Sequence, residues 1–208
     1  MKVYLIRHGA TKGNLERRYV GATDEELTPK GRALLQEKLK KWREGQDKQT
    51  EDFLEVDRVF VSPLKRCRQT AEILYPGREQ IVIEDLRECN FGEFEYKNCG
   101  ELQENSDYQK FIHSMGESGF PGGETLAAFQ ERCVRAFAQV INERESEAPA
   151  AFVVHGGTIM AILGRFSVPH KDYYEWQAGN GEGFSASVIA DGEGFYLGDI
   201  EKLWQQKS

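Results

Sequence analysis

Apolar positions recur along the chain with two spacings, one typical of strands and one typical of helices. Where the two alternate, a sheet covered by helices on both faces is expected, so the pattern predicts one α/β domain with three layers, αβα, and a mostly parallel central sheet. The predicted strands are 3–6, 58–61, 81–83 and 151–154, then a hairpin of 184–190 and 195–200 around residues 191–194. The predicted helices run over about 28–42, 62–74, 126–141 and 155–166.

Two helix starts carry the same local signal, a hydroxyl residue followed by proline. Thr28-Pro29 and Ser62-Pro63 each predict an N-cap with proline at the first helical position. Gly9, Gly13 and Asn14 are interpreted as loop residues, and the polar stretch 44–55 as a surface loop.

Residues 85–123 keep no clear period and are rich in glycine. So long an irregular stretch inside a compact domain is usually functional, so we expect a lid with some helix of its own that sets substrate choice. The lid aromatics are available to stack on a substrate, but for most of them a small core within the lid is the expected role. They are Phe91, Phe94, Tyr96, Tyr108, Phe111 and Phe120.

The net charge of −7 argues against nucleic-acid binding through phosphate neutralisation. An anionic substrate would instead need a local arginine cluster. No segment approaches the ~20 apolar residues that span a bilayer, so no membrane partner is expected. The apolar run that starts at Val3 stops at Arg7, too short for a secretory signal, and a cytoplasmic location is the expectation.

The four cysteines have neither the spacing of a zinc site nor that of a disulfide framework. We expect free thiols, no metal and no cofactor. The cysteines are Cys67, Cys89, Cys99 and Cys133.

Polar residues capable of catalysis follow three of the predicted strands. Ligands of open α/β sheets bind beyond the carboxyl ends of the strands, so these residues are expected to meet in one pocket. Two arginines beside a glycine-rich helix start favour a phosphate group as the ligand. His113 and His170 lack matching neighbours and are interpreted as ordinary histidines. The three segments are Arg7-His8-Gly9, Ser62 to Arg66, and His155-Gly156-Gly157.

Five segments, in order, resemble the motifs of the histidine phosphatase superfamily, also called phosphoglycerate mutase-like. The resemblance covers essentially the whole chain, 1–208, and implies a phosphoryl carrier that works without metal. The matching segments are 5–11 with Asn14, 21–31, 62–71, 86–95 and 154–157.

The resemblance implies a role for each matching residue. His8 would be the nucleophile, and Glu88 would protonate the leaving oxygen and later activate water. From the residues alone Glu84, Asp85, Glu93 and Glu95 are rivals of Glu88. The resemblance further places Arg7, Arg66, His155, Asn14 and Gly156 around the phosphate, and Gly21 and Thr23 at the substrate.

Two departures favour a phosphatase over a mutase: Gly13 stands where mutases have tryptophan, and the chain is short. Residues 120–126 and 91–95 resemble bacterial α-ribazole-phosphate phosphatases of cobalamin assembly, although Tyr96 replaces a usual glycine. Another small phosphomonoester, a phosphoglycerate mutase, and a non-catalytic phosphate-binding module remain alternatives. The C-terminal hairpin offers a sheet edge for a homodimer.

Overall fold

The computed structural model describes residues 1–44, 53, 55–114, 116, 118–192 and 194–204. The predicted loop 44–55 lies mostly outside the described residues, as does residue 193 of the hairpin turn.

The described strands form one mixed sheet in the order β3-β2-β4-β1-β5-β6. The first four are parallel to one another, and β5 and β6 form the predicted antiparallel hairpin at one edge. The α/β fold with a mostly parallel sheet is thereby confirmed. The strands are β1 (Lys2–Arg7), β2 (Arg58–Val61), β3 (Gln80–Val82), β4 (Ala150–Val154), β5 (Gly183–Ala190) and β6 (Phe195–Leu203).

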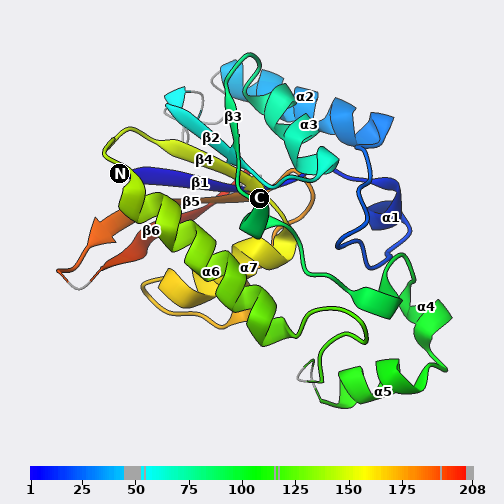
Figure 1. Ribbon diagram of the computed structural model, residues 1–208. Helices are drawn as coiled ribbons and strands as arrows, with labels where there is room; N and C mark the ends of the chain where they lie inside the picture. Colours follow the sequence, from blue (N-terminus) through cyan, green and yellow to red (C-terminus); the bar gives the residue numbers. More distant parts are fainter. Residues whose placement is uncertain (45–52, 54, 115, 117, 193, 205–208) are drawn as a thin grey trace.

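Helices cover both faces of the sheet (Figure 1). α2 (Pro29–Arg43) and α3 (Lys65–Leu74) lie on one side, and α6 (Leu126–Glu143) and α7 (Gly156–Phe166) on the other. Side chains of β1 alternate between two cores: Tyr4 and Ile6 pack on the α2–α3 side, whereas Val3 and Leu5 pack on the α6–α7 side. Burial on both faces explains why the strands read as continuous apolar runs.

The two predicted helix starts had different outcomes. Thr28 caps α2, since its side chain accepts a hydrogen bond from the Gly31 amide. The prediction for Ser62 was wrong: α3 begins at Lys65, and its N-cap position, Leu64, provides no side-chain cap. Pro63 lies in a bend before the helix, where the Ser62 hydroxyl accepts a hydrogen bond from the Leu64 amide at 3.4 Å and can still donate its own proton.

The loop predicted around Gly13 contains a short helix, α1 (Lys12–Leu15). Thr11 and Asn14 form a reciprocal capping box at its start. Four residues are too few for a helical period to show in the sequence.

Residues 85–123 contain helical pieces, as predicted: α4 (Cys99–Leu102), α5 (Ser106–His113) and two 3-10 turns, Glu84–Leu86 and Gly92–Phe94. In Figure 1 α4 and α5 project away from the sheet at the lower right. Phe94, Tyr108 and Phe120 are buried in one cluster, as predicted, but the cluster also includes Phe129 of α6 and Ala161 of α7. The lid aromatics therefore pack on the body of the domain as well as on one another and do not form a core of the lid alone. No helix among the described residues is long and apolar enough to cross a membrane.

Candidate active site

His8 follows β1 directly and is buried, with 3% of its surface exposed. Its Nδ1 lies 2.7 Å from the carbonyl oxygen of Gly9, so Nδ1–H donates to that carbonyl and the lone pair is left on Nε2. Burial, reinforced by the charges of Arg66 and Arg7, lowers the pKa of His8 well below its ordinary value. The imidazole is therefore neutral near pH 7, the form in which Nε2 is a nucleophile.

Arg66, in the first turn of α3, is completely buried beside His8. Its Nε–H donates to Nε2 of His8 over 3.2 Å. Its terminal nitrogens donate to backbone carbonyls of the loop 20–23, including Thr23 at 2.7 Å and Gly21 at 2.9 Å. The guanidinium thus lies directly against the unprotonated nitrogen of His8.

Arg7 ends β1 and lies against the start of α7. Its Nη1 donates to the Ala178 carbonyl over 2.7 Å, whereas its buried Nε has no hydrogen-bond partner within the described residues. A Cβ at Gly156 would lie 3.4 Å from that Nε, so glycine leaves room beside it. A buried unpaired N–H is costly, and a phosphate oxygen at this point would satisfy it. The first amides of α7 add further donors for an anion.

His155 is the N-cap residue of α7 and is fully buried. Its Nε2 lies 2.7 Å from the hydroxyl of Ser62, the residue that the sequence had wrongly predicted to be a helix cap. Its ring meets the His8 ring edge to face at 5.2 Å. Burial and the charge of Arg66 hold the pKa of His155 well below its usual range.

The Glu88 side chain lies between the backbone of the next residue, Cys89, and the start of α7. Its carboxylate oxygens accept hydrogen bonds from the Cys89 amide at 3.0 Å and the Gly157 amide at 3.2 Å. A Cβ at Gly157 would lie 2.4 Å from Glu88 Oε1, so this approach requires glycine. Burial raises the pKa of Glu88 despite these amides and two nearby arginines. A carboxyl group with a raised pKa suits a general acid.

The rival acidic residues lie elsewhere. Glu84 and Glu93 are exposed, and Asp85 pairs with Arg87 at 3.2 Å. Glu95 holds the loop 20–23, since its carboxylate accepts hydrogen bonds from the Ala22 amide at 2.7 Å and the Thr23 hydroxyl at 2.8 Å. The geometry therefore favours Glu88 as the acid.

Gly21 and Thr23 bind Arg66 through their carbonyls and Glu95 through their amides. A Cβ at Gly21 would lie 1.8 Å from the Cys89 carbonyl oxygen, so the loop packs tightly on the Glu88 segment. In this arrangement the two residues position Arg66, and their contact with substrate stays a prediction.

Asn14 is oriented by a residue that the sequence did not single out. Its Oδ1 accepts from Asn180 Nδ2 at 3.0 Å, and the same Nδ2 donates to the His8 carbonyl at 3.2 Å. Asn180 lies 172 positions beyond His8 in a Gly-Asn-Gly turn. Only that turn signal was present in the sequence, and it carries no information about a distant partner.

A cavity of about 380 Å³ opens beside Arg7, Glu88 and Gly156. Its wall is mainly aromatic and apolar, and Arg7 is the one cationic side chain among the described residues that line it. The 3-10 turn Tyr173–Trp176 brings part of the wall, which the sequence did not indicate. The aromatic residues of the wall are Tyr19, Phe91, Phe111, Phe120, Tyr173 and Tyr174.

His113 and His170 are exposed and take no part in this cavity. The described cysteines are free thiols, as expected. Among the described residues, no three His, Cys, Asp or Glu side chains are grouped so that they could hold a metal ion.

Comparison with known proteins agrees with this site. The family model of the histidine phosphatase superfamily (branch 1) matches residues 3–194 of the chain. The chain belongs to this superfamily, as the sequence motifs predicted.

Similar proteins carry both phosphatase and mutase names. "Probable phosphoglycerate mutase GpmB" of Escherichia fergusonii is 30% identical over 160 residues, which are 75% of this chain and 70% of that protein. A crystal structure of the α-ribazole phosphatase from Shigella flexneri matches with a TM-score of 0.78, covering 95% of this chain and 94% of that one; at 22% identity this shows the shared fold. A phosphoglycerate mutase structure from Thermus thermophilus has a TM-score of 0.66 at 29% identity, covering 90% of this chain and 93% of that one.

The structure also explains why tryptophan does not fit at position 13. A Cβ at Gly13 would lie 2.4 Å from Val20 Cγ2, 2.9 Å from Glu25 Oε2 and 3.3 Å from Tyr96 Cε2. Tyr96 itself adopts φ 60°, the conformation that glycine favours, and its hydroxyl donates to Glu25 over 2.9 Å. Gly13 and Tyr96, which both depart from expected motifs, therefore lie next to each other, and a side chain at position 13 would meet the Tyr96 ring.

Proposed function

We propose that this protein is a metal-independent phosphatase that hydrolyses a small phosphomonoester through a phosphohistidine on His8. The observation that carries the proposal is the state of His8: neutral, with Nδ1 held by the Gly9 carbonyl and Nε2 directed toward Arg66.

In the first step Nε2 of His8 attacks phosphorus and the bond from phosphorus to the leaving oxygen breaks. Arg7, Arg66 and His155 surround the transferring group and stabilise its charge, and Asn14 and the Gly156 amide add neutral donors. Glu88 gives its proton to the leaving oxygen, so the alcohol departs neutral.

In the second step water attacks the phosphohistidine. Glu88, now a carboxylate, accepts a proton from that water, the bond from phosphorus to Nε2 breaks, and inorganic phosphate leaves. His8 returns to its neutral form and Glu88 to its protonated form, so the cycle closes without a cofactor.

The cavity wall indicates the kind of leaving group. Aromatic walls favour a flat apolar group, and a leaving group with its own carboxylate would need a second cation, which the described lining residues do not offer. A phosphomonoester of a neutral aromatic alcohol or nucleoside fits best, and α-ribazole 5'-phosphate is one such compound. In this proposal residues 85–123 act as the lid that sets this preference.

A phosphoglycerate mutase is the second candidate, because similar proteins bear that name. It predicts transfer between the hydroxyls of phosphoglycerate that depends on a bisphosphate primer. The crowded space at Gly13, and a cavity wall whose described residues offer one cationic side chain, favour transfer to water.

The test is hydrolysis of a panel of phosphomonoesters, α-ribazole phosphate included, with chelator present. We expect phosphate release by the natural protein and a loss of about 10⁴-fold in His8→Ala. Activity that survives in His8→Ala or vanishes with chelator contradicts the proposal. Binding without turnover across the panel indicates the non-catalytic module, and primer-dependent interconversion of phosphoglycerates indicates the mutase.

A further inference from the structure

Arg132, on α6, is a buried arginine that the reaction steps above do not use. It is 7% exposed although it occurs in a helix whose polar residues are otherwise mostly on the solvent side. Its guanidinium makes a bidentate pair with Glu124, with both N···O distances at 2.8 Å. Such pairs fix both partners in one plane and one orientation.

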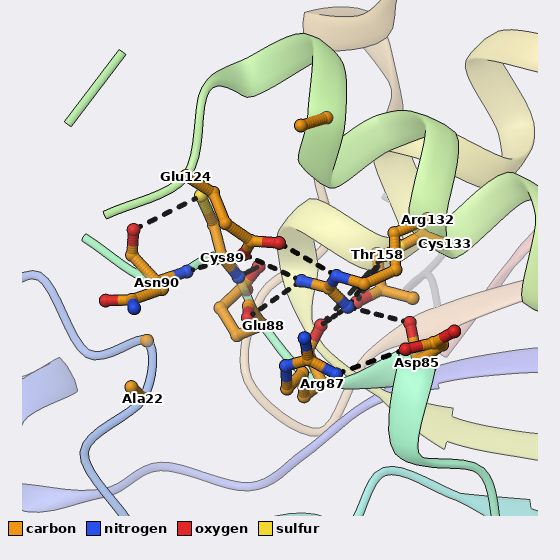
Figure 2. A network of polar contacts seen from close by, with 12 residues as sticks. Ala22, Asp85, Arg87, Glu88, Cys89, Asn90, Glu124, Arg132, Cys133 and Thr158 are labelled. Atoms are coloured by element: carbon orange, nitrogen blue, oxygen red, sulfur yellow. Dashed lines mark hydrogen bonds and ion pairs between the residues drawn. The ribbon is translucent and has the colours of Figure 1, made fainter. Parts of the chain in front are cut away.

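The same guanidinium donates hydrogen bonds to backbone carbonyls on the N-terminal side of Glu88 (Figure 2). Nη1 donates to the carbonyls of Asp85 at 2.7 Å and Arg87 at 3.1 Å, and Nη2 to that of Glu88 itself at 3.4 Å. Glu124 holds the C-terminal side, because its Oε2 accepts the Asn90 amide at 2.9 Å. The pair therefore fixes main-chain atoms on both sides of the acid.

Besides this pair, one side chain ties the segment to α7, since the Thr158 hydroxyl donates to the Leu86 carbonyl at 3.4 Å. The carboxylate of Glu88 itself has few restraints. It is placed by two amides, those of Cys89 and Gly157, and the second belongs to another element, α7. The Glu88–Gly157 contact therefore needs the 85–90 segment at one fixed distance from α7. α6 packs on both α7 and the 3-10 turn Glu84–Leu86, so Arg132 lies where it can set that distance.

We propose that Arg132 and Glu124 form a clamp that positions Glu88 for proton transfer to the leaving group. Neither residue lines the cavity of about 380 Å³ beside Arg7, so both are assigned a positioning role. The inference rests on the phosphatase function proposed above. Removing either partner of the Arg132–Glu124 pair should impair the protonation of the leaving oxygen and leave the attack by His8 intact.

The test compares two substrates that share an aromatic ring, p-nitrophenyl phosphate and benzyl phosphate. p-Nitrophenolate departs readily without a proton, whereas the benzyl alkoxide needs one. In Arg132→Met we expect kcat/KM, which reports the first phosphoryl transfer, to fall about 100-fold for benzyl phosphate and less than about 5-fold for p-nitrophenyl phosphate. Glu124→Gln keeps the shape of the pair and should show the same bias more weakly.

Arg135→Met is the matched control, because Arg135 lies on the same helix, is 67% exposed and reaches Asp85 only at 3.8 Å. Arg135→Met should leave kcat/KM unchanged for both substrates. Equal losses for both substrates in Arg132→Met and Glu124→Gln, or no loss in either variant, would overturn the clamp.

Amide hydrogen exchange separates the clamp from the proposed function. Exchange at 85–90 should quicken in Arg132→Met and stay unchanged in Arg135→Met, whether or not any substrate is turned over. If the natural protein hydrolyses nothing, the phosphatase proposal fails while this experiment still reports on the clamp. Unchanged exchange in Arg132→Met overturns the clamp even if the phosphatase is real.

Discussion

The proposed phosphate end of the site, formed by His8, Arg66 and Glu88, and its aromatic end, formed by the wall of the neighbouring cavity, are built differently. At the phosphate end, His8, Arg66 and Glu88 are fixed by contacts with main-chain atoms: the Gly9 carbonyl, the carbonyls of 20–23, and the Gly157 amide. At the aromatic end, Phe91, Phe111 and Phe120 pack on one another's rings. The residues to which the proposal gives the chemistry are thus held by the backbone, whereas the aromatic wall is held by contacts between side chains. We therefore expect substitutions in the wall to leave the phosphate end undisturbed.

The largest effect that this comparison predicts is at Arg66. In Arg66→Lys the ammonium cannot reach both His8 and the loop carbonyls, because it lacks the guanidinium fork. We expect kcat/KM for p-nitrophenyl phosphate to fall about 100- to 1000-fold. Arg68→Lys, an exposed position on the same helix, is the control and should be near the natural rate. A loss below tenfold in Arg66→Lys would mean that the fork is dispensable.

The next largest loss of activity is expected at Glu95. This residue links the two ends, since it lies close in sequence to Phe91 of the wall and its carboxylate holds the loop 20–23, which binds Arg66. Glu95→Gln removes the charge that several N–H and O–H donors share, so kcat/KM should drop about tenfold without a change in aromatic preference. Glu93→Gln, two positions earlier and exposed, should have no effect. If Glu95→Gln changed the preference for aromatic over aliphatic substrates and left kcat/KM for the preferred one unchanged, Glu95 would act as part of the aromatic wall and not through Arg66.

At the aromatic end we expect a smaller and selective effect. Phe111→Leu keeps the wall apolar but removes a ring, so kcat/KM for phenyl phosphate should fall about fivefold while that for methyl phosphate stays constant. Ile112→Ala, 50% exposed on the same helix, is the control. Equal losses for phenyl and methyl phosphate would show that the wall supports the phosphate end after all.

The sequence predicted that His8, Arg66 and His155 lie together, because these residues follow strand ends and belong to motifs, and the structure brings them together. Their binding of phosphate stays a prediction. β2 was predicted residue for residue, and Thr28 as cap of α2. Ser62 was misassigned because the same Ser-Pro signal fits a helix start and an extended turn, and only the partner in space, His155, decides between them. Arg132 gave no signal, since an arginine on an amphipathic helix normally indicates the solvent face.

The smallest effect concerns stability and pH. Burial lowers the pKa of His8 and His155 in the folded protein, so the unfolded chain takes up protons first as the pH falls. Stability from each histidine is present above about pH 6.5 and should decline by about 1 kcal/mol between pH 6.5 and 5.5. The raised pKa of Glu88 acts in the opposite sense, since the unfolded carboxyl ionises first as the pH rises above about 4.5.

Urea unfolding of the natural protein and of His8→Asn at both pH values measures the histidine contribution. The decline should be smaller in His8→Asn by about 1 kcal/mol. An equal decline in both proteins would mean that His8 carries no shifted pKa.

The central claim, that His8 carries the phosphoryl group, is tested most directly by trapping it. The natural protein is mixed with labelled p-nitrophenyl phosphate, quenched in base on the millisecond scale and digested for mass spectrometry. We expect one acid-labile phosphate on the peptide that contains His8, formed as fast as p-nitrophenol is released and absent from His8→Ala. Release of p-nitrophenol with no label on His8, or label on His155 instead, would contradict it.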